Sequence, residues 1–292
     1  MSLNVKNDEE VSRTALMSAA ARAAHLVVDG RPPIFADTLA YPLLGEQADD
    51  LIGYHRAHGE HLVLRGARTA ALTRSRYTED RLAEAVGRGI GQYVILGAGL
   101  DSYAYRAGKD GPVRVFEVDH PATQRWKRRA LDGAGVPDPG TVAFVPVDFE
   151  RDDLAERLTG EGFDPAAPAL VSWLGVTMYL TREAIGHTLA VLGGLAPGTE
   201  LVVEWMLPES LRDEEGRAYA EAVAQVSAQG GEPWLTFLGP DEATAVLGEH
   251  GLEVVGHAFQ RDAIDPALWE RTDALLPQNL SLLTHARVPV RG

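Results

Sequence analysis

Five short runs rich in β-branched and aromatic residues alternate with helical stretches between residues 93 and 205. This alternation constrains the fold more than any other feature, because parallel strands need a crossover, usually a helix, between each strand and the next. The pattern predicts a parallel sheet that is covered by helices on both faces. The runs are 93–96, 113–118, 142–147, 169–174 and 200–205, and the helical stretches include 121–132, 151–159 and 182–196.

Two later runs complete the predicted sheet. Residues 252–259 and 280–288 are expected to form a closing antiparallel pair at one edge. Residues 240–251 are expected to form a helix, with Asp241 as its N-cap and Gly251 at its end. We therefore predict an α/β, Rossmann-like fold built on a seven-stranded, mostly parallel, doubly wound sheet.

Further helical segments are expected to cover the carboxyl edge of this sheet. Residues 9–29 are rich in alanine, and residues 60–87 contain few helix-breaking residues. The proline-rich stretch 31–45 between them is expected to be an irregular connector. An acidic helical stretch follows the fifth strand and is interpreted as an insertion or lid. The predicted boundaries of this one integrated domain are 1–87 for the helical cap, 88–292 for the sheet domain and 206–235 for the lid.

The chain has 292 residues, a formal net charge of −15 and no cysteine. An acidic chain repels nucleic-acid phosphates and anionic membrane surfaces, so neither nucleic acid nor a membrane is an expected partner. The absence of cysteine excludes disulfides, thiolate metal sites and a cysteine nucleophile. No run has the apolar length of a membrane span, and the first residues lack a secretory signal, so we expect a cytoplasmic protein. The sequence leaves the oligomeric state open.

The ends of three successive predicted strands carry chemistry that suits a nucleoside. The first strand ends in GAG (97–99), where glycine lets the backbone approach a ligand and adopt a positive φ. Asp119 ends the second strand, 20 residues after the last of these glycines, in the usual place of a ribose-hydroxyl acceptor. Asp148 and Phe149 end the third strand and are expected to bind the adenine amine and cover the adenine face.

The residues after the glycines favour a ligand without phosphates. Ser102 occupies the place of the third glycine in a dinucleotide-binding motif. Asp101 follows the loop directly and would repel a pyrophosphate. These two residues disfavour NAD and favour S-adenosylmethionine, which has an adenosine, a sulfonium cation and an amino-acid end.

The chain also resembles the leucine carboxyl methyltransferase family. The resemblance runs from about Thr14 to about Gly251 and is greatest to the bacterial S-adenosylmethionine-dependent branch, which includes polyketide O-methyltransferases. It rests on four motifs together: LGAGLDSYAYR (96–106), FEVDHP (116–121), TALMSAAARA (14–23) and RSRYTED (74–80).

This resemblance implies a map of cofactor-binding residues. Arg22 and Arg74 match family positions where basic side chains approach the cofactor carboxylate, which an arginine can bind with two parallel hydrogen bonds. Arg65 and Arg68 are instead expected on a solvated helix face. The full set of implied cofactor residues is Arg22, Arg74, Gly97, Ala98, Gly99, Asp119, His120, Asp148, Phe149 and Leu174.

Leu174 departs from the family pattern. The family usually has Glu-Gly at the end of the fourth strand, whereas this chain has Leu174 before Gly175. The missing glutamate would help to receive the cofactor's ammonium group, so we expect weaker cofactor binding. Backbone carbonyls of Gly97 or Leu174 are the expected substitutes.

The acceptor pocket is less well defined by the sequence. Residues just past the glycine loop or near later strand ends are candidate lining residues: Tyr103, Arg106, Tyr179, Glu204 and Trp205. The sequence identifies no general base, since neither His120 nor His187 has a position that marks it as one, and catalytic residues are not assigned. The histidines His55, His58 and His61 fan around a helix, so no metal site is predicted.

The leading interpretation is an O-methyltransferase that acts on a carboxylate or hydroxyl of a small molecule, such as a secondary metabolite. Three alternatives stay open at this point. The first is a nucleotide-dependent oxidoreductase on the same sheet, and the second is a non-catalytic protein that binds adenosine ligands. The third is methylation of a protein C-terminal carboxylate.

Overall fold

The computed structural model describes residues 12–109, 111–149 and 151–290, and it contains one seven-stranded sheet. The strand order is β3-β2-β1-β4-β5-β7-β6, in which the first five strands of the sequence run parallel and β7 runs antiparallel to both of its neighbours. The predicted sheet and its antiparallel closing pair are therefore confirmed. The strands are β1 (Gln92–Leu96), β2 (Arg114–Asp119), β3 (Val142–Pro146), β4 (Leu170–Trp173), β5 (Glu200–Met206), β6 (Glu253–Phe259) and β7 (Ser281–Arg287).

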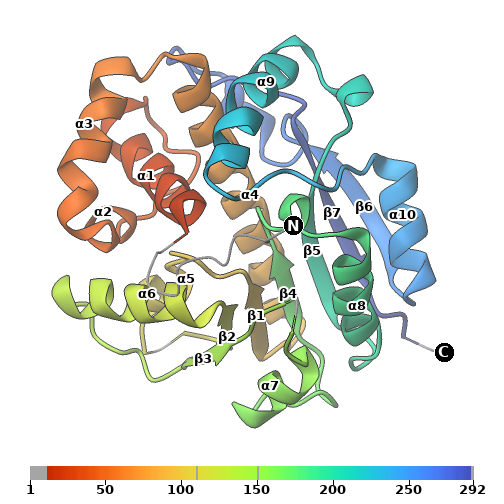
Figure 1. Ribbon diagram of the computed structural model, residues 1–292. Helices are drawn as coiled ribbons and strands as arrows, with labels where there is room; N and C mark the ends of the chain where they lie inside the picture. The colour runs from red at the N-terminus through yellow and green to blue at the C-terminus, as the bar shows by residue number, and fades with distance from the viewer. Residues whose placement is uncertain (1–11, 110, 150, 291–292) are drawn as a thin grey trace.

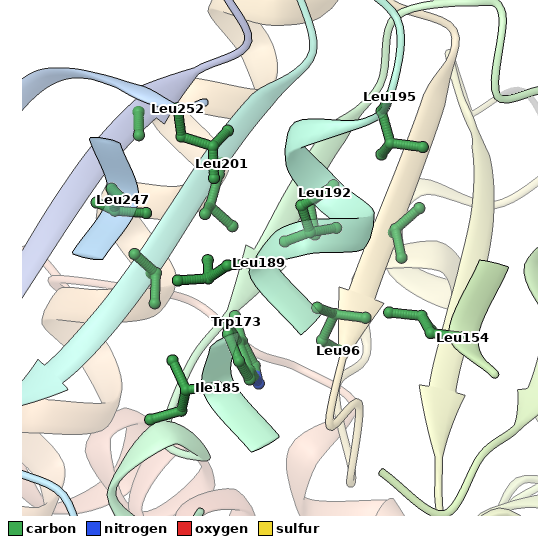
Figure 2. Close-up of a cluster of buried hydrophobic side chains, with 14 of the residues drawn as sticks. Leu96, Leu154, Trp173, Ile185, Leu189, Leu192, Leu195, Leu201, Leu247 and Leu252 are labelled. Carbon is green, nitrogen blue, oxygen red and sulfur yellow. The ribbon is translucent and has the colours of Figure 1, made fainter. Parts of the chain in front are cut away.

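Helices cover both faces of the sheet. On one face, α7 (Leu154–Gly160), α8 (Arg182–Gly193) and α10 (Pro240–Glu249) pack against the strands. Figure 2 shows Leu189 and Leu192 of α8 beside Trp173 and Leu96 of the sheet. On the other face lie the carboxyl half of α4 (Leu62–Gly87) and two shorter helices, α5 (Tyr103–Ala107) and α6 (Pro121–Gly133).

The strands alternate their side chains between these two faces. Val94 and Leu96 of β1 belong to the cluster beneath α8, whereas Tyr93 and Ile95 pack against α4 and α5. This period of two follows from the strand backbone and decides which residues near a strand end can reach the ligand side.

A helical cap lies beyond the carboxyl ends of the parallel strands. It consists of α1 (Arg13–Val28), α2 (Ala40–Leu43), α3 (Ala48–His58), the start of α4, and α9 (Glu214–Gln229) from the predicted lid (Figure 1). Within the described residues, no helix is both long and apolar enough to cross a bilayer.

Several local predictions need correction. The stretch 31–45 is irregular only as far as α2, because residues 40–43 are helical. Asp241 lies in the first turn of α10, and the N-cap is Gly239, whose N–H donates to Oε2 of Glu242 at 3.1 Å. Gly251 has φ +78° just after α10, as its predicted place at the helix end requires. Residues 9–11 of the predicted first helix lie outside the described residues.

Arg68 is not on a solvated face. Its guanidinium is 1 % exposed and donates to both carboxylate oxygens of Asp29, at 2.8 and 3.0 Å, and to the carbonyl of Gly59 at 2.8 Å. A third nitrogen lies 3.1 Å from Nδ1 of His55. This side of α4 faces α1 and α3, so Arg68 joins three segments of the cap.

The buried histidine beside Arg68 should make the cap sensitive to acid. Burial, together with the Arg68 cation, lowers the pKa of His55 to about 4. Between about pH 6.5 and pH 4, the unfolded chain therefore binds a proton at His55 more readily than the folded chain does. The contribution of neutral His55 to the stability of the fold is fully present above pH 6.5 and is lost as the pH falls toward 4. Between pH 7 and pH 5, we expect the free energy of unfolding to fall by about 2 kcal/mol less in a His55→Asn variant than in the parent protein. Urea unfolding at both pH values measures this, and equal losses would contradict it.

Candidate functional site

The glycine loop after β1 is shaped by close packing as well as by its backbone angles. Gly97 has φ +70° and Gly99 has φ +47°. A Cβ at Gly97 would lie 2.3 Å from Cγ2 of Val176, and one at Gly99 would lie 3.1 Å from the Cβ of Ala15. The N–H groups of Gly97 and Ala98 both donate to the carbonyl of Val118, at 2.8 and 3.0 Å. Neither glycine position has room for a side chain, so the loop presents bare backbone.

Asp119 stands at the end of β2 and is tied to this loop. Its carboxylate accepts the N–H of Gly99 at 2.5 Å and that of His120 at 2.6 Å. Burial raises the pKa of Asp119, and the two backbone N–H groups offset part of this effect. Each carboxylate oxygen has further acceptor capacity. His120 accepts the N–H of Ala122 through Nδ1 and caps α6.

Asp148 and Phe149 follow β3, which is the neighbour of β2. The N–H of Asp148 donates to Asp152 at 2.9 Å, and Phe149 is partly buried against the main core. Since β3, β2 and β1 are adjacent, the structure brings the three predicted strand ends to one edge of the sheet.

Arg22 is hydrogen-bonded to the end of the glycine loop. It is 8 % exposed and donates to the carbonyl of Leu100 at 2.7 Å, to Asp37 at 2.8 Å and to the hydroxyl of Ser18 at 3.1 Å. Asp37 also accepts the hydroxyl of Ser102 at 2.6 Å. Burial would raise the pKa of Asp37, but Arg22 and these hydrogen bonds hold it below its usual value. Asp37 is not among the predicted site residues, because an aspartate in a proline-rich connector carries no motif.

Two of the predicted acceptor-pocket residues, Tyr103 and Arg106, contact residues of β1 and α4. Arg106 pairs with Glu79 and donates to Ser102 at 2.9 Å. Tyr103 packs edge-on against Tyr93, with ring centroids 5.4 Å apart. Both side chains belong to α5, which turns them toward α4 and β1, and neither lines the cavity described below.

Trp205 points into the core and also does not line this cavity. It is 1 % exposed and lies in the core beneath α8, whereas the preceding Glu204 points to the opposite face. Alternation along β5 therefore allows only Glu204 of the two to reach the pocket.

A cavity of about 190 Å³ lies between the cap and the ends of β4 and β5. We call it the α9 cavity. Its walls come from α1, α4, the segment after β4, β5, α9 and the start of β7, and they include the predicted residues Arg74, Tyr179 and Glu204. The lining residues are Arg13, Thr14, Met17, Ser18, Ala67, Ala70, Ala71, Arg74, Gly175, Met178, Tyr179, Glu204, Met206, Tyr219, Val223, Val226, Ser227, Gly230, Glu232, Trp234, Leu280 and Ser281.

An ion pair between the partly exposed Arg74 and the buried Glu204 lies in the wall of the α9 cavity. Nη1 of Arg74 lies 3.1 Å from Oε2 of Glu204, and Nη2 donates to Ser18 at 2.9 Å. The hydroxyl of Ser281 donates to Oε1 of Glu204 at 2.8 Å. Gly175 lies against the guanidinium of Arg74, so closely that a Cβ at this position would be 2.9 Å from Nη1.

The remaining walls of the cavity are largely apolar. The chain has four methionines, and the three that follow Met1 all line this cavity together with Tyr179, Tyr219 and Trp234. Burial raises the pKa of Tyr219 to about 12, so its hydroxyl is protonated at neutral pH. Methionine and aromatic side chains make adaptable contacts with apolar ligands.

Helix α9 and the segment that follows it form one wall of the cavity. Glu232, just after α9, accepts hydrogen bonds from the hydroxyls of Ser12, at 3.1 Å, and Thr14. At the other end of the helix, Glu215 pairs with Arg65 of α4 at 2.5 Å. The predicted lid is thus held to both α1 and α4.

The three histidines of α3 and its C-terminal turn do not converge. His55 faces Arg68, His58 packs against Tyr54, and His61 caps α4. In the part of the chain that the structure describes, no three His, Cys, Asp or Glu side chains are grouped to hold a metal ion.

Comparison with known proteins identifies the family. The family model for leucine carboxyl methyltransferases matches residues 15–193. The chain belongs to this family. YktD of Bacillus subtilis, described as an S-adenosyl-L-methionine-dependent methyltransferase, is 32 % identical over 289 residues, covering 91 % of this chain and 94 % of YktD. Rv0830 of Mycobacterium tuberculosis, described in the same way, is 33 % identical over 226 residues, covering 74 % of this chain and 73 % of its own. The resemblance inferred from the motifs is confirmed.

Solved structures share the fold at lower identity. A methyltransferase-type protein from Thermobifida fusca has a TM-score of 0.60 at 17 % identity, over 98 % of this chain and 97 % of its own. A DUF574 protein from Streptomyces avermitilis has a TM-score of 0.61 at 17 % identity, over 97 % of this chain and 99 % of its own. At this identity the match concerns the fold, and it agrees with the predicted methyltransferase sheet.

The contact between Gly97 and Val176 should make the glycine loop intolerant of a methyl group. We expect Gly97→Ala to reduce the free energy of unfolding by about 2 kcal/mol, because the new Cβ meets Val176 and alanine resists a positive φ. A Gly97→Ala/Val176→Ala double variant should recover the steric part when compared with Val176→Ala alone. Urea denaturation measures both. Additive losses in the double variant would show that Val176 is not the obstacle.

The hydrogen bonds of Glu232 should hold the lid closed. In a Glu232→Gln variant, a neutral amide with a single acceptor oxygen replaces a carboxylate that accepts two hydroxyls, so we expect hydrogen exchange in α9 to accelerate about fivefold. The matched control is Glu221→Gln, at an exposed position of α9. Equal exchange in the two variants would mean that Glu232 does not restrain the helix.

Proposed function

We propose that this chain transfers a methyl group from S-adenosylmethionine to a carboxylate or hydroxyl oxygen of a small, largely apolar molecule. The observation that carries the proposal is that residues 175 and 176 connect the α9 cavity with the glycine loop. Val176, which contacts the loop at Gly97, follows Gly175, which lines the cavity. A ligand lying on the loop would therefore reach the cavity with one end.

The residues at the three strand ends fit the cofactor. Gly97, Ala98 and Gly99 would pass beneath the methionine part as bare backbone, because close packing against Val176 and Ala15 excludes a side chain at either glycine. Asp119, with its remaining acceptor capacity, would hold the ribose hydroxyls, next to His120. Asp148 and Phe149 would bind and cover the adenine. When bound, S-adenosylmethionine supplies an electrophilic methyl group on a sulfonium.

The two arginines have different roles in this proposal. Arg74 faces the cavity and would pair with the cofactor carboxylate. Arg22 donates hydrogen bonds to Asp37, Ser18 and the carbonyl of Leu100, so its role would be to position the glycine loop. This division refines the expectation that both arginines approach the carboxylate.

The size and lining of the cavity support a small acceptor over a polypeptide. Its volume of about 190 Å³ is below the range of about 300–1,000 Å³ that is typical of pockets for drug-sized ligands. A protein tail would need an open groove, whereas Glu232 joins the segment after α9 to the start of α1 at one wall of the cavity. The methionines and aromatic residues favour an apolar body, such as that of a secondary metabolite. A cytoplasmic location is part of the same proposal.

The chain's part in the reaction is alignment and exclusion of water. Methyl transfer is an in-line displacement, so its rate depends on the alignment of the acceptor oxygen, methyl carbon and sulfur. The cap and α9 would hold the acceptor and keep bulk water from the sulfonium. A carboxylate acceptor needs no general base at neutral pH, which fits a cavity that no histidine lines.

Calorimetric titration with S-adenosylmethionine, S-adenosylhomocysteine and NAD tests the cofactor assignment. We expect binding of the two sulfur nucleosides and none of NAD. Asp119→Asn should weaken both by about tenfold or more, because it removes a charged partner of the ribose hydroxyls. Asp132→Asn, at an exposed position of α6, is the matched control. Binding of NAD alone would overturn the proposal. Tight binding without turnover on apolar carboxylic acids and phenols would favour the non-catalytic alternative.

A further inference from the structure

We propose that Glu204 binds the ammonium group of the cofactor's amino-acid end, while Arg74 binds its carboxylate. This inference rests on the proposed function and assigns one end of its ligand to a receptor made of two side chains. Glu204 would supply the negative charge that the residue at position 174 lacks.

Glu204 is a buried carboxylate that is paired with Arg74 at the cavity wall. It is 2 % exposed, yet it lines the α9 cavity. Its two oxygens accept hydrogen bonds from Arg74 and Ser281, which leaves a further lone pair on each. A buried ion pair adds little stability by itself, because desolvation offsets most of the attraction. A pair kept at a cavity wall is therefore better explained by what it binds.

The sheet register places this carboxylate next to position 174. Trp173 of β4 is the register partner of Val203 of β5. Leu174 directly follows β4, and a continued register would set it opposite Glu204; it packs with Val202 and Leu283, on the face of the sheet to which Glu204 also points. A carboxylate on β5 thus lies one strand away from the position where Leu174 offers only an apolar side chain.

Two chains of contacts connect the ion pair with the glycine loop. In the first, Arg74 lies against Gly175, and the next residue, Val176, lies against Gly97. In the second, the hydroxyl of Ser18 accepts from both Arg74 and Arg22, and Arg22 donates to the carbonyl of Leu100. An amino-acid group that extends from the loop toward the cavity therefore meets this pair.

The chemistry of the pair complements an α-amino acid. A guanidinium forms paired hydrogen bonds with a carboxylate, and a carboxylate oxygen accepts from an ammonium group. Because the two charges of the pair are already neighbours, a zwitterion can bind without leaving either charge buried alone.

Three ligands that share the adenosine part separate this role from any other. They are S-adenosylhomocysteine, its deaminated analogue S-adenosyl-4-thiobutyrate, which keeps the carboxylate, and 5′-methylthioadenosine, which lacks the whole amino-acid end. Calorimetry should show that the parent protein binds S-adenosylhomocysteine about 10- to 100-fold more tightly than the deaminated analogue. Glu204→Gln should abolish most of this preference and leave the affinity for 5′-methylthioadenosine unchanged.

Two control variants separate the role of the Glu204 charge from a general effect on β5 or on the fold. Glu200→Gln removes a hydrogen-bonded carboxylate at the other end of the same strand and should keep the preference. Ser281→Ala retains the Glu204 charge but loses one hydrogen bond to it, so it should reduce the preference in part. Near-ultraviolet circular dichroism verifies the fold of each variant, and Ser281→Ala carries the test if Glu204→Gln does not fold.

An unchanged preference in a folded Glu204→Gln variant would overturn the inference, since the ammonium group would then bind elsewhere. An equal loss of affinity for all three ligands would also overturn it, because Glu204 would then act only through the fold. Failure of the proposed function gives a different result, in which the parent protein binds none of the three ligands.

Discussion

The ion pair between Arg22 and Asp37 is the interaction on which the arrangement of the site depends. Arg22 comes from the first helix of the cap and Asp37 from the connector that follows it, and both are bonded to the glycine loop. Breaking such a pair leaves an uncompensated buried charge, which is strongly destabilising. The pair therefore fixes α1 against the loop, and with it the Ala15 and Ser18 side chains that define the space above the glycines.

Contacts of charged residues also hold the cap together around the α9 cavity. Arg68 joins α1, α3 and α4 beneath the surface, and Glu232 joins the end of α9 to the start of α1. Methionines and aromatic residues form much of the cavity wall, and its charged lining residues are Arg74 and Glu204, which pair with each other, together with Arg13 and Glu232. In the proposed function, these charges would orient a substrate that the methionines and aromatic residues pack.

Much of this protein was predictable from local sequence patterns. The alternation of strands and helices, the glycine loop and the acids at the next two strand ends are short-range signals, and the sheet brings them together as expected. The errors concern side chains whose direction depends on packing. Trp205 and Glu204 are neighbours in the sequence, but the strand turns one into the core and the other into the cavity. Arg68 and Arg74 lie on one helix, yet they serve the cap and the cavity respectively.

The sequence by itself determined the family, the topology and the kind of ligand, because strand periodicity and the motifs at strand ends are local properties of the chain. Only the tertiary structure decided which polar residues meet. The bonding of Asp37 to the loop, the pairing of Arg74 with Glu204 and the contact of Val176 with Gly97 join residues 65 to 130 positions apart. Such contacts follow from the packing of helices on the sheet and from register between strands, and neither leaves a signature in one sequence.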